Sequence, residues 1–211
     1  MQHKLRVWIS KHLEGNFVAY FTMLVFLIIG IVVGAITIKM LNIDQKNKIL
    51  SFFNSFFVLM NGNEIDNLML FKESIKNNFR TVLIIWLTGA IIIGIPIIPV
   101  IVVLRGFALG FTVGFLVNEF GAKGFLFSVL AIMPQNLFII PGIISISSIG
   151  INFSLSNVKG NKIKSNYNNL FSNFINYSTL IFLFSLVIFI GSLVEAYVTP
   201  IFMRLITDYI N

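Results

Sequence analysis

The 211-residue sequence contains no cysteine, which excludes disulfide bonds and every metal site built on thiolate ligands. It has two histidines, His3 and His12, both close to the N-terminus. Charged residues are also scarce: they make up 11% of the chain, whereas a soluble domain carries about 25%. Water is therefore not the main solvent of this protein.

Motifs for common catalytic chemistry are missing as well. The sequence contains no His-Glu-x-x-His, no Gly-x-Ser-x-Gly and no phosphate-binding P-loop. Acidic residues inside the apolar segments are too few for an aspartyl dyad. We therefore expect no enzymatic activity, no metal and no cofactor.

The formal net charge of +7 does not indicate a nucleic-acid-binding protein. The basic residues lie at the ends of apolar segments and in the loops between them, and they form no dense tract. Basic residues in these places are typical of membrane edges. The expected partner is the lipid bilayer, and no nucleic acid is expected.

Long apolar segments are what the sequence has in abundance, since 57% of its residues are hydrophobic. The run 17–38 carries no charge and would be roughly 33 Å long as a helix, enough to cross a hydrocarbon core of about 30 Å. It is longer than the apolar region of a signal peptide and lacks a clear cleavage site. We expect a retained first transmembrane helix, preceded by a cytoplasmic tail at residues 1–16.

Residues 81–211 are expected to form a membrane core with four further spans. Because proline disrupts a helix one turn back, Pro96 and Pro99 predict a tight turn between the second and third spans. One kinked helix through Leu104, followed by a re-entrant piece, is the alternative. The predicted fold is all-α, a polytopic membrane bundle of about five transmembrane helices. The four further spans are expected at residues 81–95, 100–118, 125–150 and 174–194.

Residues 39–80 have a different character, with ten charges of both signs. Apolar residues recur at helical spacing on both sides of Asn61-Gly62-Asn63, which predicts an external amphipathic helical hairpin. Its apolar faces can bind a partner, lie on the membrane or pack on the protein's own bundle. The residues expected to contact a partner are Phe52, Phe53, Phe56, Phe57, Leu68 and Phe71.

The distribution of lysine and arginine predicts the orientation. Short segments rich in lysine and arginine usually lie on the cytoplasmic side of a membrane. We therefore expect a cytoplasmic N-terminus and an external C-terminus. The residues expected inside are Lys4, Arg6, Lys11, Arg105, Lys159, Lys162 and Lys164. Only Lys123 and Arg204 are expected outside in short segments.

Glycines at four-residue spacing predict close helix packing. Gly106, Gly110 and Gly114 share one face of the expected third helix, and Gly30 and Gly34 offer a smaller version on the first. Such faces let helix backbones approach in lipid, where packing replaces the hydrophobic force. Two interpretations remain open: tight packing inside one bundle, and a seam for a homo-oligomer or a partner.

A small set of polar residues and prolines lies within the apolar segments. Arg105 is expected either to reach the cytoplasmic headgroups or to pair inside the bundle, and Glu195 to lie near the opposite face. Prolines interrupt the expected fourth span, where polar side chains can satisfy the freed carbonyls. A broken helix of this kind also fits a small permease or channel subunit, which is the alternative function. The residues that break this span or could satisfy its carbonyls are Pro134, Gln135, Asn136 and Pro141.

Two sequence strings carry a resemblance to a known family. They are Gly110-Phe111-Thr112-Val113-Gly114-Phe115-Leu116 and Leu130-x-x-x-Pro134-Gln135-Asn136, and the stretches 121–125 and 194–200 are similar too. Together they resemble the stage II sporulation protein M family over essentially the whole chain.

The resemblance implies a role in endospore engulfment. It implies a non-enzymatic scaffold in the mother-cell membrane at the sporulation septum. The scaffold would recruit and organise septal peptidoglycan-degrading enzymes, namely the stage II sporulation proteins D and P.

Overall fold

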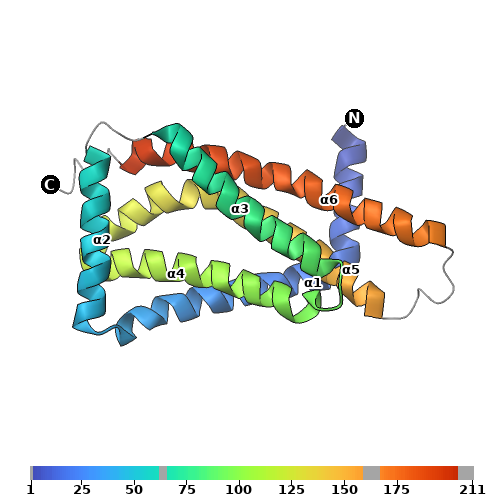
Figure 1. The fold of residues 1–211 in the computed structure, drawn as a ribbon, viewed down its shortest axis with the longest axis horizontal. Helices are drawn as coiled ribbons and strands as arrows, with labels where there is room; N and C mark the ends of the chain where they lie inside the picture. Colours follow the sequence, from blue (N-terminus) through green and yellow to red (C-terminus); the bar gives the residue numbers. More distant parts are fainter. Residues whose placement is uncertain (1, 62–65, 159–166, 204–211) are drawn as a thin grey trace.

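The computed structural model describes residues 2–61, 66–158 and 167–203, and all regular secondary structure in these ranges is helical (Figure 1). The predicted all-α class is thus confirmed. The long helices are α1 (Gln2–Thr37), α2 (Ile43–Asn61), α3 (Asn67–Gly89), α4 (Gly94–Phe127), α5 (Met133–Val158) and α6 (Tyr167–Leu193). Three short turns join or extend them: η1 (Ile38–Met40), η2 (Ser128–Ile132) and η3 (Val194–Val198).

The helices form a bundle with one helix across its end. In Figure 1, α4, α5 and α6 lie lengthwise, α3 lies obliquely over them, and α2 stands across one end. Helix α1 packs mainly along α4, and α3 contacts α4, α5 and α6. One apolar core joins α1, α3, α4, α5 and α6, and it includes Met23, Ile85, Val102 and Ile146.

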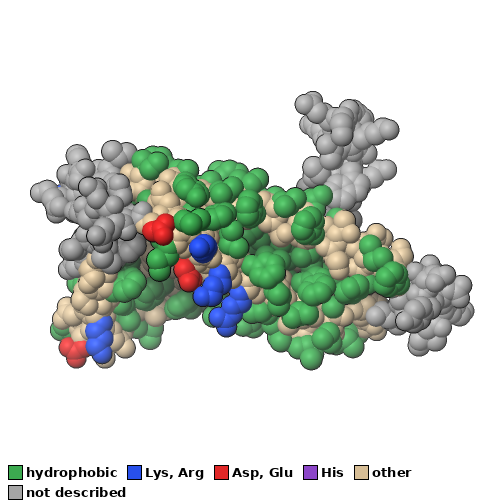
Figure 2. Space-filling model, turned by 45° about the horizontal axis from the view of Figure 1, so that its top comes forward, with side chains coloured by type: hydrophobic (Ala, Val, Ile, Leu, Met, Phe, Trp, Pro, Cys, Tyr) green, Lys and Arg blue, Asp and Glu red, His purple; other side chains and the backbone are tan. Residues whose placement is uncertain are grey.

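Three helical stretches of the described ranges are long and apolar enough to cross a membrane: Asn16–Met40, Gly94–Val158 and Phe171–Met203. Large apolar side chains such as Phe21, Val32 and Phe182 are exposed on them, as expected where lipid is the solvent. Figure 2 shows hydrophobic side chains over most of one face, with charged ones gathered toward the end where α2 lies. The predicted count of five spans is not confirmed.

The second stretch folds back on itself at Gly121. This glycine has φ 58° and ψ −132°, a conformation that side-chain-bearing residues rarely adopt. Leu116, before the turn, packs with Phe127 and Ala131, after it, which shows that the chain reverses there. Helices α4 and α5 are therefore antiparallel arms of one apolar stretch.

The turn between α3 and α4 lies earlier than predicted. Helix α3 ends at Gly89 and α4 begins at Gly94, so Pro96 lies in the first turn of α4 instead of forming the loop. A proline costs no hydrogen bond there, because the first four N–H groups of a helix have no intrahelical acceptor. Helix α4 continues past Leu104 beside α1, so the re-entrant alternative is wrong.

The predicted external hairpin does not form as expected. Helix α2 ends at Asn61, where the sequence predicted a break, but α3 runs without interruption from Asn67 into the expected second span. Asp66 caps α3 by accepting a 2.9 Å hydrogen bond from the Leu68 backbone N–H. The buried line of α3 is polar in its first half and apolar in its second, and consists of Ser74, Asn78, Val82, Ile85 and Gly89.

The prolines of the expected fourth span do not interrupt the helix. A wide π turn, η2, precedes Pro134, and the Met133 N–H bonds to the Ser128 carbonyl five residues back. A wider turn relieves the clash that a proline ring makes with the carbonyl four residues earlier. A second π turn, η3, precedes Pro200 in the same way, with Thr199 N–H bonded to the Val194 carbonyl.

Replacing Gly121 with alanine should lower the free energy of unfolding by about 1–3 kcal/mol, because a residue with a Cβ is strained in this backbone conformation. An added Cβ would meet no atom within 4 Å, so the loss of stability would come from backbone strain and not from a steric clash. Thermal unfolding of the purified protein in detergent measures it, with Ala122→Ser as the neighbouring exposed control. Equal melting temperatures for both variants would contradict the strained turn.

Candidate functional site

Helices α1 and α4 touch backbone to backbone. A Cβ built on Gly30 would collide with the backbone of Val103 and Phe107, and one on Gly106 would collide with that of Leu27. Residues later in α1 contact residues later in α4, so the two helices are parallel. The predicted packing glycines all lie at this contact, which we name the glycine seam: Gly30, Gly34, Gly106, Gly110 and Gly114.

The seam lies inside one chain. The glycine rows of α1 and α4 face each other and leave no room between them, so they form the two halves of one contact. In this chain the glycine faces are thus occupied by each other, and a homo-oligomer stays a prediction. Any contact between copies has to use other surfaces.

Arg105 lies beside the seam but points into the bundle. Its Nη2 donates hydrogen bonds to Asn78 Oδ1 at 3.1 Å and to Thr81 Oγ1 at 2.7 Å. Arg105 is about three turns into α4, and its neighbour Gly106 packs near the middle of the first apolar stretch. The guanidinium is thus held by α3, and the expectation that it reaches the cytoplasmic headgroups is wrong.

Glu195 lies in η3 and is connected to Arg105 through α3. Its Oε2 accepts a 2.6 Å hydrogen bond from Ser74 Oγ. The Asn78 side chain donates to Ser74 Oγ at 3.4 Å and to Ser192 Oγ at 3.0 Å. We name this chain of hydrogen bonds, from Arg105 through Asn78 and Ser74 to Glu195, the polar relay.

The relay borders a cavity of about 260 Å³, here called the inner cavity, which is open to the surface at Asn77 and Ala108. Arg105 and Glu195 both line it, so the expectation that they lie near opposite faces is wrong. Its other polar lining residues are Asn77, Asn78, Thr112, Gln135 and Asn136. An adjoining cavity of about 410 Å³ shares Asn77 and Glu195 with it. The adjoining cavity is also lined by Glu73, Ser74, Lys76 and Arg80.

The residues around Pro134 join the two π turns. Gln135 Oε1 accepts a 2.6 Å hydrogen bond from Thr199 Oγ1, and both residues are buried. Asn136 Nδ2 donates to the Ile132 carbonyl at 2.8 Å, and the Pro141 carbonyl accepts from Ser145 Oγ at 2.8 Å. Wide turns are frequent at functional sites, and here both lie next to the inner cavity.

Several residues of this site were not predicted from the sequence, among them Ser74, Asn78, Ser192 and Thr199. The signal for two of them was the four-residue spacing of Ser74 and Asn78 on α3. It was hidden by the apolar stripe on the same helix, of which Leu68 and Phe79 turn out to be exposed. The buried face of this part of α3 is the polar one.

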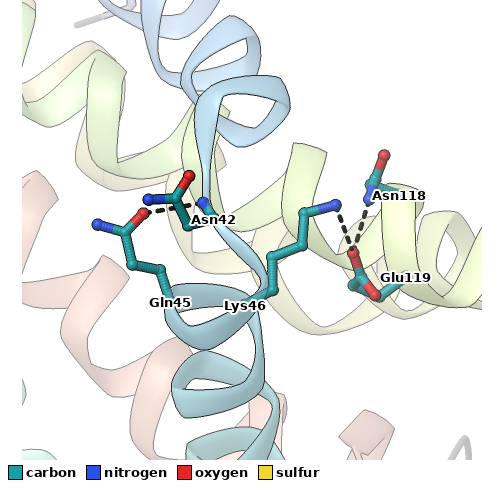
Figure 3. Close-up of polar contacts among 5 residues, drawn as sticks. All are labelled: Asn42, Gln45, Lys46, Asn118 and Glu119. Atoms are coloured by element: carbon teal, nitrogen blue, oxygen red, sulfur yellow. Dashed lines mark hydrogen bonds and ion pairs between the residues drawn. The ribbon is translucent and has the colours of Figure 1, made fainter.

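Helix α2 begins with a side-chain cap and contacts the end of α4 through one ion pair (Figure 3). Gln45 Oε1 accepts a 3.0 Å hydrogen bond from the Asn42 N–H at the start of α2. Lys46 Nζ lies 3.6 Å from Glu119 Oε1, which also accepts from Asn118 Nδ2 at 2.6 Å.

The residues expected to contact a partner divide into two groups. The Phe53 ring stacks on Phe115 with centroids 5.6 Å apart, and Phe71 packs against Phe189 and Tyr197. These two side chains therefore pack on the protein's own bundle. Phe52 and Leu68 are 69% and 52% exposed, whereas the side chains of Phe56 and Phe57 lie outside the described residues.

An all-helical bundle with three membrane-length apolar stretches and polar side chains in its interior is a polytopic membrane protein. The family model described as Stage II sporulation protein M matches residues 23–200, and the chain belongs to that family. The match spans the glycine seam, the polar relay and both π turns, and the resemblance found in the sequence is confirmed. Comparisons with curated proteins and with solved structures gave no match. The chain is thus a membrane protein of a sporulation family.

Replacing Gly110 with alanine should cost about 1–3 kcal/mol of stability, because its Cβ would lie 2.7 Å from Ile31 Cα, in rigid backbone. Gly114→Ala is the matched control on the same face, since its Cβ would first meet the end of the Ile38 side chain, with the nearest backbone atom, Ala35 Cα, at 3.3 Å. Unfolding in detergent should therefore separate the two variants clearly. Equal losses would show that backbone contact does not set the packing of α1 on α4.

Proposed function

We propose that this protein is a non-enzymatic membrane scaffold that recruits and organises septal peptidoglycan-degrading enzymes during endospore engulfment. The observation that carries the proposal is the family match over residues 23–200. The proposed location is the mother-cell membrane at the sporulation septum. The proposed partners are the stage II sporulation proteins D and P.

The proposed orientation, with a cytoplasmic N-terminus, determines on which side of the membrane the other helix ends lie. With the N-terminus in the cytoplasm, α1 runs outward, and α4, being parallel to α1, runs outward too. The end of α1, the Gly121 turn and Met203 then all lie at the outer end beside α2. Helix α3 has 23 residues, or roughly 34 Å, and is proposed as a further span with its charged first half near the outer surface.

Helix α2 is suited to hold a partner at that outer surface. It contacts α4 through Lys46 and Phe53, while Phe52 stays exposed. Leu68, at the start of α3, is exposed as well. Such a surface would bind hydrolases next to the cell wall and raise their local concentration there.

The inner cavity favours a second candidate function, a small permease or channel subunit. Arg105, Gln135 and Glu195 line it, as a polar pathway through the bundle would require. Farther along α5, however, the lining becomes apolar at Ile139, Ile140 and Ile143. The scaffold remains the leading proposal, because a cavity with one polar end resembles a binding site more than a conducting path.

The orientation predicts which side of the membrane α2 faces. Because the chain has no cysteine, Ser51→Cys creates a unique label site on an exposed position of α2. A membrane-impermeant maleimide should label it in intact cells from which the outer wall has been removed. Labelling only after the membrane is permeabilised would reverse the proposed orientation.

The scaffold role predicts what the protein binds. Tagged wild-type protein, solubilised from cells in early sporulation, should recover both hydrolases, and Phe52→Ala combined with Leu68→Ala should reduce recovery about tenfold or more, as loss of interface anchors does. Phe182→Ala is the matched control, because this phenylalanine is 67% exposed on α6 among apolar neighbours. Failure of the wild-type protein to recover either hydrolase would remove the scaffold proposal and make transport assays the next step.

A further inference from the structure

The inner cavity carries opposite formal charges on two of its walls. Arg105 enters from α4 and Glu195 from η3. Within the described ranges, the ion pairs join Lys46 to Glu119 and Lys76 to Glu73, so neither cavity charge takes part in one. The relay holds them apart, with neutral Asn78 and Ser74 between them.

Both charged groups keep hydrogen-bonding capacity at the cavity wall. Arg105 uses Nη2 for its two bonds with α3, while a guanidinium has five N–H donors in a planar fork. Glu195 uses Oε2 for Ser74, and a carboxylate accepts at two oxygens. Charges inside a membrane bundle are costly unless they are paired. Both groups can therefore form further hydrogen bonds with a ligand in the cavity.

The charge pattern selects the chemistry of that ligand. A simple anion drawn to Arg105 would be repelled by Glu195, and a simple cation drawn to Glu195 would be repelled by Arg105. A molecule that carries both a positive and a negative charge can pair with Arg105 and Glu195 at the same time. The guanidinium fork suits a carboxylate or phosphate oxyanion, and the carboxylate suits an ammonium group.

The size and lining of the cavity fit a small polar molecule. Its volume of about 260 Å³ far exceeds the space of about 10–15 Å³ that one water needs. Asn77, Gln135 and Asn136 add neutral amide groups between the charged walls. The adjoining cavity, which shares Asn77 and Glu195, is also lined by the charged residues Glu73, Lys76 and Arg80.

We propose that the inner cavity binds a small zwitterion whose oxyanion meets Arg105 and whose ammonium group meets Glu195. The same chemistry has two sources: a free amino acid, or the phosphate and ammonium of a phosphatidylethanolamine headgroup. The proposal does not rest on the scaffold role. It holds or fails by binding alone.

The test uses the purified full-length protein in detergent, with calorimetry and thermal unfolding as readouts. Glycine should bind at least about tenfold tighter than acetate or methylammonium, which carry its two charges singly. In a second arm, phosphatidylethanolamine and phosphatidylglycerol are added to the micelles. Stabilisation by phosphatidylethanolamine alone, without a response to glycine, would identify the lipid headgroup as the ligand.

Variants locate the binding to the two walls. Arg105→Gln and Glu195→Gln should each weaken binding at least about tenfold. Lys46→Gln, which removes a charge from the α2–α4 ion pair outside the cavity, should leave binding unchanged. Because Arg105→Gln risks misfolding, Ala108→Leu provides a second variant: it adds bulk at the cavity lining, keeps both charges and should abolish binding.

Three results would overturn the proposal. The first is no response to either glycine or phosphatidylethanolamine. The second is acetate or methylammonium binding as tightly as glycine, which would show a site for one charge only. The third is undiminished binding by the folded Glu195→Gln or Ala108→Leu variant.

Discussion

The contact between α1 and α4 determines where the other parts of the molecule lie. Glycine in facing rows allows the two backbones to meet, so the position of α4 along α1 is fixed to within a fraction of a turn. Arg105 precedes Gly106, and its depth in the bundle follows from this register. The Gly121 turn then places α5 against α4, and Glu119 at the end of α4 anchors α2. Packing in lipid thus sets the geometry of the polar groups.

Helix α3 makes it feasible to hold an arginine inside such a bundle. Its amide and hydroxyl groups accept the guanidinium hydrogen bonds, and its serine donates to the distant carboxylate. Neutral groups orient both charges without cancelling them. A direct ion pair would have closed the space between them, whereas the relay leaves a cavity open.

Much of this architecture was predictable, because some of its causes are local in sequence. The uncharged run 17–38, the break at Asn61 and the glycine spacing each follow from neighbouring residues. The polar face of α3 was not predictable, because the exposed Leu68 and Phe79 imitate a buried stripe and only the neighbouring helices decide which side is covered. Nor could spacing alone reveal that Arg105 and Glu195 share a cavity. Whether the two side chains line the same cavity depends on how four separate helical segments pack.

The two π turns have a consequence for how this chain can vary. Each wide turn accommodates one residue more than a regular helix would, which rotates everything beyond it by about 100°. In η3 this added rotation precedes Thr199, which reaches Gln135 just after η2. Deleting a single residue from either turn would restore a regular helix yet turn Thr199 or Gln135 away from the other. The length of these five-residue segments therefore determines whether Thr199 and Gln135 face each other.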